Sequence, residues 1–330
     1  MPIRSTRKSE TYFDFFATSG NEADRFDYDP PPVNRGTRAI FAGGGTYPAA
    51  PNGTNTIDYI TITGATGNAN DFGDLVNNCG GSGQASNGTI ARICGGAGEN
   101  KIQNITFATT GNATDTGDLT AATYAGNAVS NGTRGVFTGF DSNSNKIDYF
   151  SFGGGDASDF GDLYNGDTNM GAVQDMTRGV FGGGANDSPN VRSNIIQYLT
   201  VATTGNTQDF GDLTIRRDGP SGVSDNSRGV FGGGNQYPTT FFSNVIDYIT
   251  ISSTGNATDF GDLTQGRMYV STEGASGKEG RGAFAGGNAG PTTYDKTNVI
   301  DYITIQTTGN ATDYGDLTVA RGRVSSSTGT

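Results

Sequence analysis

Aspartates recur at fixed places in this chain, and they are the residues best suited to chemistry. Six copies of a phrase close to Asp-Phe-Gly-Asp-Leu each carry two of them. Carboxylate oxygens are the ligands that Ca²⁺ prefers, and a pair of carboxylates can serve a glycosidase. The twelve are Asp71, Asp74, Asp115, Asp118, Asp159, Asp162, Asp209, Asp212, Asp259, Asp262, Asp313 and Asp316.

The regular recurrence favours a structural role for these carboxylates. An active site should break the symmetry of a repeat, whereas these residues follow it. An arginine also recurs in five copies, so Arg–carboxylate pairing or capping of turn N–H groups explains the pattern without an ion. We therefore expect no metal and no cofactor, and keep calcium as the alternative. The arginines are Arg38, Arg134, Arg178, Arg228 and Arg281.

Histidine is absent from the chain. The sequence thus lacks the usual general base, the usual zinc or copper ligand, and any Ser-His or Cys-His nucleophile pair. We expect no catalytic residues and no enzyme, with a polysaccharide-active hydrolase as the least favoured alternative. The two cysteines, Cys79 and Cys94, lack metal-site spacing, and two free thiols are favoured over a disulfide.

The glycine between the two aspartates of each copy gives the period of the repeat. Successive copies are 44 to 54 residues apart. Periods of this size indicate propeller blades or solenoid turns. The glycines are Gly73, Gly117, Gly161, Gly211, Gly261 and Gly315.

Each copy contains three strand-like runs rich in β-branched and aromatic residues, such as 229–231, 245–251 and 259–263. A fourth, Ser/Gly-rich stretch such as 269–272 lacks bulk and suits the crowded centre of a ring. Helical periodicity is absent. The pattern predicts an all-β, six-bladed propeller with four strands per blade. Gly-Asn pairs such as 255–256 predict a two-residue turn between the last two strands of a blade.

The two ends of the chain predict how the ring closes. The first copy begins at its second strand, within 36–45, whereas 321–330 resembles a missing first strand. Pairing them removes an open sheet edge. We therefore predict an N-terminal arm over 1–35 and a propeller over 36–330. The expected units are 36–75, 80–119, 123–163, 169–213, 219–263 and 268–317, with the closing strand at 321–330.

The repeat resembles two known groups of sequences. A glycine pair or triplet, an Ile-Asp-Tyr strand and an Arg-then-small strand resemble kelch-type repeats over about 295 of the 330 residues. The chain has no tryptophan, which kelch repeats usually carry. The Asn-Ala-Thr-Asp-Phe-Gly-Asp-Leu phrase resembles repeats in proteins of tailed phages, especially marine ones, thought to be virion or tail components. The residues expected to replace the tryptophan are Phe72, Phe160, Phe210, Phe260 and Tyr314.

Charge and hydropathy limit the partners. The net charge of −12 argues against a nucleic-acid partner bound through phosphates. No apolar run approaches 18 residues, and the N-terminus lacks the apolar core of a secretory signal. We expect no membrane insertion, synthesis in the host cytoplasm, and a final location on the virion.

The loops that break the repeat are the expected ligand-binding surface. Long loops between the second and third strands carry aromatic residues, and loops entering the next blade on the same face carry arginines. Exposed rings beside arginines suit a saccharide or a protein partner. The alternative is that the rings fold back over their own loops. The candidates are Tyr47, Tyr237, Phe241, Phe242, Tyr294, Arg216, Arg217 and Arg267.

The arm combines basic, aromatic and acidic stretches before three consecutive prolines, 30–32, which predict a stiff spacer. We hypothesise that it docks the propeller onto other virion proteins, with packing on its own blades as the alternative. The phage resemblance implies a structural or accessory protein of the tail, a fibre or the capsid decoration, presenting its loop face for host attachment. The alternative is a cellular kelch-like adaptor. The docking candidates are Arg4, Arg7, Tyr12, Phe13, Phe15 and Phe16.

Overall fold

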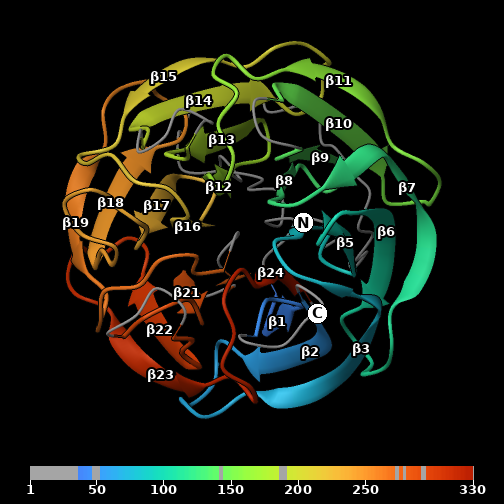
Figure 1. The fold of residues 1–330 in the computed structure, drawn as a ribbon, viewed down its shortest axis with the longest axis horizontal. Helices are drawn as coiled ribbons and strands as arrows, with labels where there is room; N and C mark the ends of the chain where they lie inside the picture. The colour runs from blue at the N-terminus through green and yellow to red at the C-terminus, as the bar shows by residue number, and fades with distance from the viewer. Residues whose placement is uncertain are drawn as a thin grey trace, which may run out of the picture. The chain divides into compact units, whose positions relative to one another are not determined.

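The computed structural model describes residues 36–46, 53–140, 144–185, 192–271, 275–277, 280–290 and 295–329. In these ranges the chain forms six four-stranded antiparallel sheets arranged as a ring (Figure 1), which is the predicted six-bladed propeller. No helix in these ranges has the length and apolar character needed to cross a membrane. The docking candidates of the arm, together with Tyr47 and Tyr294, lie outside the described residues.

Each blade runs from an innermost strand a to an outermost strand d. Blade 1 comprises β24 (Ser325–Gly329), β1 (Arg38–Ala42), β2 (Thr54–Thr61) and β3 (Asn70–Cys79). Blade 2 comprises β4 (Gly83–Ser86), β5 (Ile90–Gly96), β6 (Glu99–Thr106) and β7 (Thr114–Thr123). Blade 3 comprises β8 (Asn127–Ser130), β9 (Arg134–Thr138), β10 (Lys146–Ser151) and β11 (Ser158–Asp162).

The second half of the ring repeats this order. Blade 4 comprises β12 (Gly171–Gln174), β13 (Arg178–Gly182), β14 (Ile195–Thr200) and β15 (Gln208–Asp212). Blade 5 comprises β16 (Ser221–Ser224), β17 (Arg228–Gly232), β18 (Val245–Thr250) and β19 (Thr258–Asp262). Blade 6 comprises β20 (Ala275–Ser276), β21 (Arg281–Ala285), β22 (Val299–Thr304) and β23 (Thr312–Asp316).

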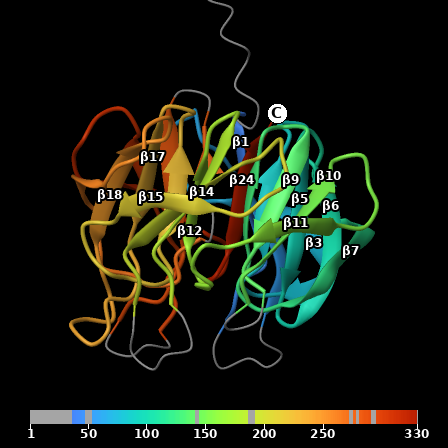
Figure 2. The same ribbon diagram turned by 90° about the horizontal axis from the view of Figure 1, so that it is seen from above.

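The C-terminal strand closes the ring, as the sequence predicts. β24 pairs antiparallel with β1, with Ala42 opposite Ser325 and Arg38 opposite Gly329. The two strands lie side by side in the edge-on view of Figure 2. Blade 1 therefore combines both ends of the described chain, and the pairing covers the edge of β1 that would otherwise be open.

Apolar side chains fill the space between neighbouring blades. The described residues form six buried clusters, each shared by two adjacent blades. Between blades 5 and 6, Ile246 and Phe260 of one blade pack with Phe284 and Ile303 of the next. Strand c alternates its side chains between the two faces of the sheet, so each blade contributes to two clusters. No blade has a core of its own, and the ring is stabilised as a whole.

Small residues on strand a place it at the centre of the ring, as the sequence predicts. The strands there are close enough for side chains of adjacent blades to hydrogen-bond. Ser82 Oγ donates to Ser325 Oγ at 3.0 Å, and the hydroxyls of Ser221 and Ser271 lie 3.1 Å apart. Bulkier side chains would not fit so near the axis.

The predicted two-residue Gly-Asn turn is wrong. The connection between β18 and β19 spans residues 251–257, and its Gly-Asn pair contacts the preceding blade. Gly255 N–H donates to Phe210 O at 2.8 Å, and Asn256 Oδ1 accepts from Asp212 N–H at 3.0 Å. A Cβ built on Gly211 would lie 2.4 Å from the carbonyl oxygen of Gly255. The glycine between the paired aspartates therefore admits the loop of the next blade.

We predict that this contact makes Gly315 much less tolerant of alanine than the glycine it touches. A Cβ on Gly315 would lie 2.5 Å from Gly67 O, at a φ of 146°, whereas a Cβ on Gly67 meets open space. Gly315→Ala should lower the free energy of unfolding by about 2–4 kcal/mol, and the matched Gly67→Ala by less than about 1 kcal/mol. Urea denaturation measures both, and equal losses would contradict the contact.

The recurring arginine of strand b has a different partner from the expected carboxylate. Arg228 stacks on Tyr248 of its own blade, with 4.2 Å from guanidinium carbon to ring centroid, and donates to Ile305 O of the next blade at 3.1 Å. Tyr248 in turn meets Phe260 edge-on. Cation–π attraction and a carbonyl partner satisfy this arginine. Its equivalents Arg38, Arg134, Arg178 and Arg281 make the same two contacts.

Candidate functional site

Two of the predicted loop-face arginines are buried. Arg217 and Arg267 are both 0% exposed, each in an ion pair with the aspartate of the Ile-Asp-Tyr strand. Arg267 Nη2 lies 2.7 Å from Asp301 Oδ2, and its Nη1 donates to Val299 O and Gly286 O. The prediction that Arg217 and Arg267 bind a ligand on the surface is therefore wrong. Their guanidinium groups form ion pairs and hydrogen bonds with strand c.

The buried aspartate also receives hydrogen bonds from the preceding blade. Thr264, which follows strand d of blade 5, donates its hydroxyl to Asp301 Oδ1 at 2.6 Å and its N–H to Oδ2 at 3.1 Å. Arg321, Asp58 and Thr318 repeat this arrangement where the last blade meets the first. A carboxylate on each of these strands thus joins two blades, and saturation of its oxygens compensates for its burial.

The other three blades fill the same positions with different chemistry. In blade 2, Cys79 stands in the arginine position and Gln103 in the aspartate position, and Gln103 Nε2 donates to Cys79 Sγ at 3.4 Å. Burial raises the pKa of Cys79 to about 11. In blade 3, Asp148 keeps its threonine partner, Thr120, but has Thr123 in place of the arginine, and burial raises its pKa. Blade 4 uses Asp167 with Gln197.

We predict that Arg267→Met lowers the free energy of unfolding by about 3–5 kcal/mol, because it leaves Asp301 buried without a cation. The double variant Arg267→Cys/Asp301→Gln copies blade 2 and should recover more than half of the loss. Urea denaturation of both variants checks this. A double variant no more stable than Arg267→Met would show that the cost lies in lost packing rather than in the unpaired charge.

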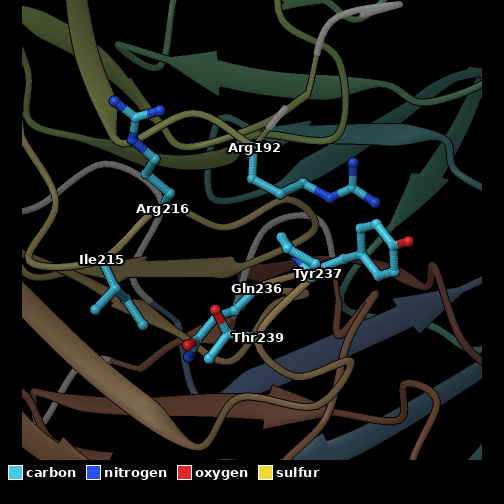
Figure 3. Close-up of a pocket in the computed structure, with 7 residues that line it drawn as sticks. Arg192, Ile215, Arg216, Gln236, Tyr237 and Thr239 are labelled. Carbon is cyan, nitrogen blue, oxygen red and sulfur yellow. The ribbon is translucent and has the colours of Figure 1, made fainter. Parts of the chain in front are cut away.

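An open pocket of about 450 Å³ lies on the loop face between blades 4 and 5. The loop between β17 and β18 supplies Gln236, Tyr237 and Thr239 to its lining. The connection from β15 to β16 supplies Arg216, and the segment before β14 supplies Arg192. Figure 3 shows these side chains around the pocket. The remaining lining residues are Ile215 and Pro238.

Contacts with neighbours hold one wall of the pocket. The guanidinium of Arg192 lies 5.9 Å from the centre of the Tyr237 ring (Figure 3). The Nε atom of Arg192 lies 3.1 Å from the buried carboxylate of Asp218. Tyr237 also packs on Phe241, with ring centroids 5.3 Å apart. Asn235 Oδ1 accepts from the N–H of Tyr237 at 2.9 Å. The aromatic wall is thus fixed before any ligand arrives.

Arg216 leaves a free cation in the pocket. Its side chain is exposed and makes no ion pair or hydrogen bond with the described residues. It points away from Arg192 in Figure 3. The pocket therefore offers two guanidinium groups, one ring face, and the amide and hydroxyl of Gln236 and Thr239. Such a set can stack against a flat ligand and donate hydrogen bonds to oxygen atoms.

The six predicted loop-face residues that the structure describes divide into three groups, of which the buried Arg217 and Arg267 are the first. Arg216 and Tyr237 come together in the pocket, and Phe241, 42% exposed, stands behind Tyr237. Phe242 is half-buried and outside the pocket lining. Arg192, which sequence reasoning missed, follows the long loop of blade 4. Two features of the sequence could have identified Arg192. They are the length of that loop and the presence of a cation next to the aromatic loop of the following blade.

In the described residues, the recurrent aspartates do not form a metal site and the two cysteines do not form a disulfide. In the described ranges, no three His, Cys, Asp or Glu side chains gather in a way that could hold a metal ion. The strand-d aspartates lie at the outer edge of the ring, and Asp259 is exposed. Cys79 and Cys94 are buried and do not form a disulfide.

Comparison with known proteins was made at two levels, protein families and individual curated proteins. No protein-family model matches the chain, and no curated protein matches it. The six-bladed propeller is therefore established by the geometry of the sheets, and neither comparison supports the resemblance to kelch repeats or to phage repeats.

Proposed function

We propose that this chain is a non-enzymatic structural or accessory protein of a phage particle, part of the tail, a fibre or the capsid decoration. In this proposal the arm docks it to other virion proteins, and its loop face binds a polysaccharide or a protein on the host surface. The resemblance of the repeat phrase to those of tailed-phage proteins supports the location.

The observation that carries the binding role is the composition of the loop-face pocket. It combines a fixed aromatic wall, Tyr237 on Phe241, with the free cation of Arg216, on a ring that is held rigid by contacts between blades. Preformed concave sites of this kind bind ligands without an ordering cost. No carboxylate is among the described residues that line it, so these residues do not supply the acid and nucleophile of a glycosidase. These features favour binding over hydrolysis.

We predict that Tyr237→Ala and Arg216→Ala each reduce retention of the labelled protein on host cells at least fivefold. The reason is that they remove the stacking surface and the free cation. Tyr164→Ala is the matched control, because Tyr164 is 64% exposed but lies outside the pocket. Flow cytometry measures retention. Equal losses in all three variants would point to non-specific adhesion, and no loss in any would remove the pocket from the function.

We predict that the chain is present at a fixed copy number in purified phage particles from the source culture. Quantitative mass spectrometry of the particles measures this, and gold-labelled antibody locates the chain on head or tail. Absence from particles, with the chain recovered from cell lysate, would favour a cellular kelch-like adaptor that binds one partner through the same face.

A further inference from the structure

Four charged side chains gather beside the pocket, two on segments that precede strand a and two on segments that precede strand c. This inner-rim cluster consists of Arg192, Asp218, Lys296 and Arg323, contributed by blades 4, 5, 6 and 1. Arg192 forms an ion pair with Asp218 at 3.1 Å. The charge of Arg323 acts to lower the pKa of both Asp218 and Lys296. Two cations, Arg192 and Arg323, therefore act on one buried carboxylate, and the third, Lys296, lies near Arg323, in a chain whose net charge is −12.

Burial, more than the neighbouring charges, affects the ionisation of the cluster. Burial and the nearby Arg323 lower the pKa of Lys296 to about 8. Burial raises the pKa of Asp218 to about 6, in spite of Arg192 and Arg323. Lys296 Nζ donates to Asn288 Oδ1 at 2.7 Å, a neutral partner. The other carboxylate of this loop, Asp295, is exposed and lies against Gly290.

The backbone carries strain where it presents Arg323 of the cluster and the adjacent Tyr269. Asn169, Gly219, Tyr269 and Arg323 occupy the same position in four copies, all with φ between 51° and 63°. Glycine adopts this conformation without cost, whereas it is unfavourable for a bulky residue. Blade 5 uses glycine, but blades 6 and 1 keep tyrosine and arginine. Blades 6 and 1 thus keep a strained backbone that glycine avoids at the equivalent position of blade 5. Such retained strain indicates that the side chains of Tyr269 and Arg323 have a function.

The strained residues form a stack across three blades. The Tyr269 ring covers Gly219, since a Cβ on that glycine would lie 2.5 Å from Cδ1 of the ring. The guanidinium carbon of Arg323 lies 4.2 Å from the centre of the same ring. Stacking on an aromatic ring leaves the N–H edges of a guanidinium available for an anion. The stack therefore presents Arg323 beside Lys296 on the loop face.

The cluster and the pocket share a residue. Arg192 pairs with Asp218 in the cluster and lies over Tyr237 in the pocket wall. A ligand that stacks on Tyr237 is thus bordered by Arg216 in the pocket and by the three cations of the inner rim. The amide of Gln236 and the hydroxyl of Thr239 suit the hydroxyl groups of a sugar.

We propose that the loop-face pocket and the inner-rim cluster form one site for an acidic saccharide. A sugar ring packs on Tyr237, while carboxylate or sulfate groups pair with Arg192, Arg323 and Lys296. This inference rests on the proposed binding function of the loop face and names its ligand class. A neutral glycan would offer no anionic group to the three cations, and an acidic peptide would make little use of the ring face.

The test uses Arg323→Gly, which removes the cation and gives the backbone the residue that blade 5 has. Asn169→Gly is the matched control, because it makes the same backbone change at an uncharged side chain. Neither variant should have a lower Tm than wild type. Lys296→Gln is the second variant. The probes are a galacturonate hexamer, its fully methyl-esterified form and a hexa-aspartate peptide, with affinities measured by calorimetry.

We expect wild type and Asn169→Gly to bind the galacturonate hexamer equally, and Arg323→Gly and Lys296→Gln to bind it about tenfold more weakly. The esterified hexamer and the peptide should bind at least tenfold more weakly than the galacturonate hexamer. Equal affinity for the esterified hexamer, or unchanged affinity in Arg323→Gly, overturns the acidic-ligand inference but leaves the loop-face function intact. Tighter binding of the peptide overturns the saccharide. If no hexamer binds while Tyr237→Ala still detaches the protein from cells, only this inference fails.

Discussion

A buried carboxylate at the crossing of two blades is the interaction on which the ring depends most. Asp58, Asp247 and Asp301 each sit fully buried on strand c, with a threonine of the preceding blade and an arginine as partners. A buried charge is costly unless every oxygen is satisfied. Its burial therefore ties the position of one blade to that of the next. Where the arginine is missing, blades 2 and 4 have glutamine in the aspartate position, and blade 3 keeps Asp148, whose pKa is raised by burial.

A second constraint follows from how closely the blades approach. The loop between strands c and d lies on strand d of the preceding blade, and the glycine there leaves room for a backbone carbonyl. The same contact recurs around the ring, including Gly315 with Gly67 where the ring closes. The most regular phrase of the sequence is therefore a contact between blades. Function is left to the positions at which the copies differ.

Those differences concentrate on one side of the loop face. Blades 4 and 5 bring Arg192, Arg216 and Tyr237 into the pocket, and blades 6 and 1 add Lys296 and Arg323 beside it. At each of these positions, other copies of the repeat carry a different residue. A rigid ring is a suitable support for such a surface, because the contacts between blades hold the loops without spending the loop residues on stability.

The sequence by itself determined the number of blades, the four strands of each, the small innermost strand and the closure by a strand within 321–330, because periodicity and side-chain bulk are local properties. It also predicted that Arg216 and Tyr237 lie on the same loop face. Only the tertiary structure decided that Arg217 and Arg267 are buried, that the Gly-Asn pair contacts a neighbouring blade, and that Arg192 lines the pocket. An arginine's partner is chosen across blades, at sequence separations of 30 residues and more. Repeat spacing does not specify which side of a strand meets which loop, since that depends on how the ring packs.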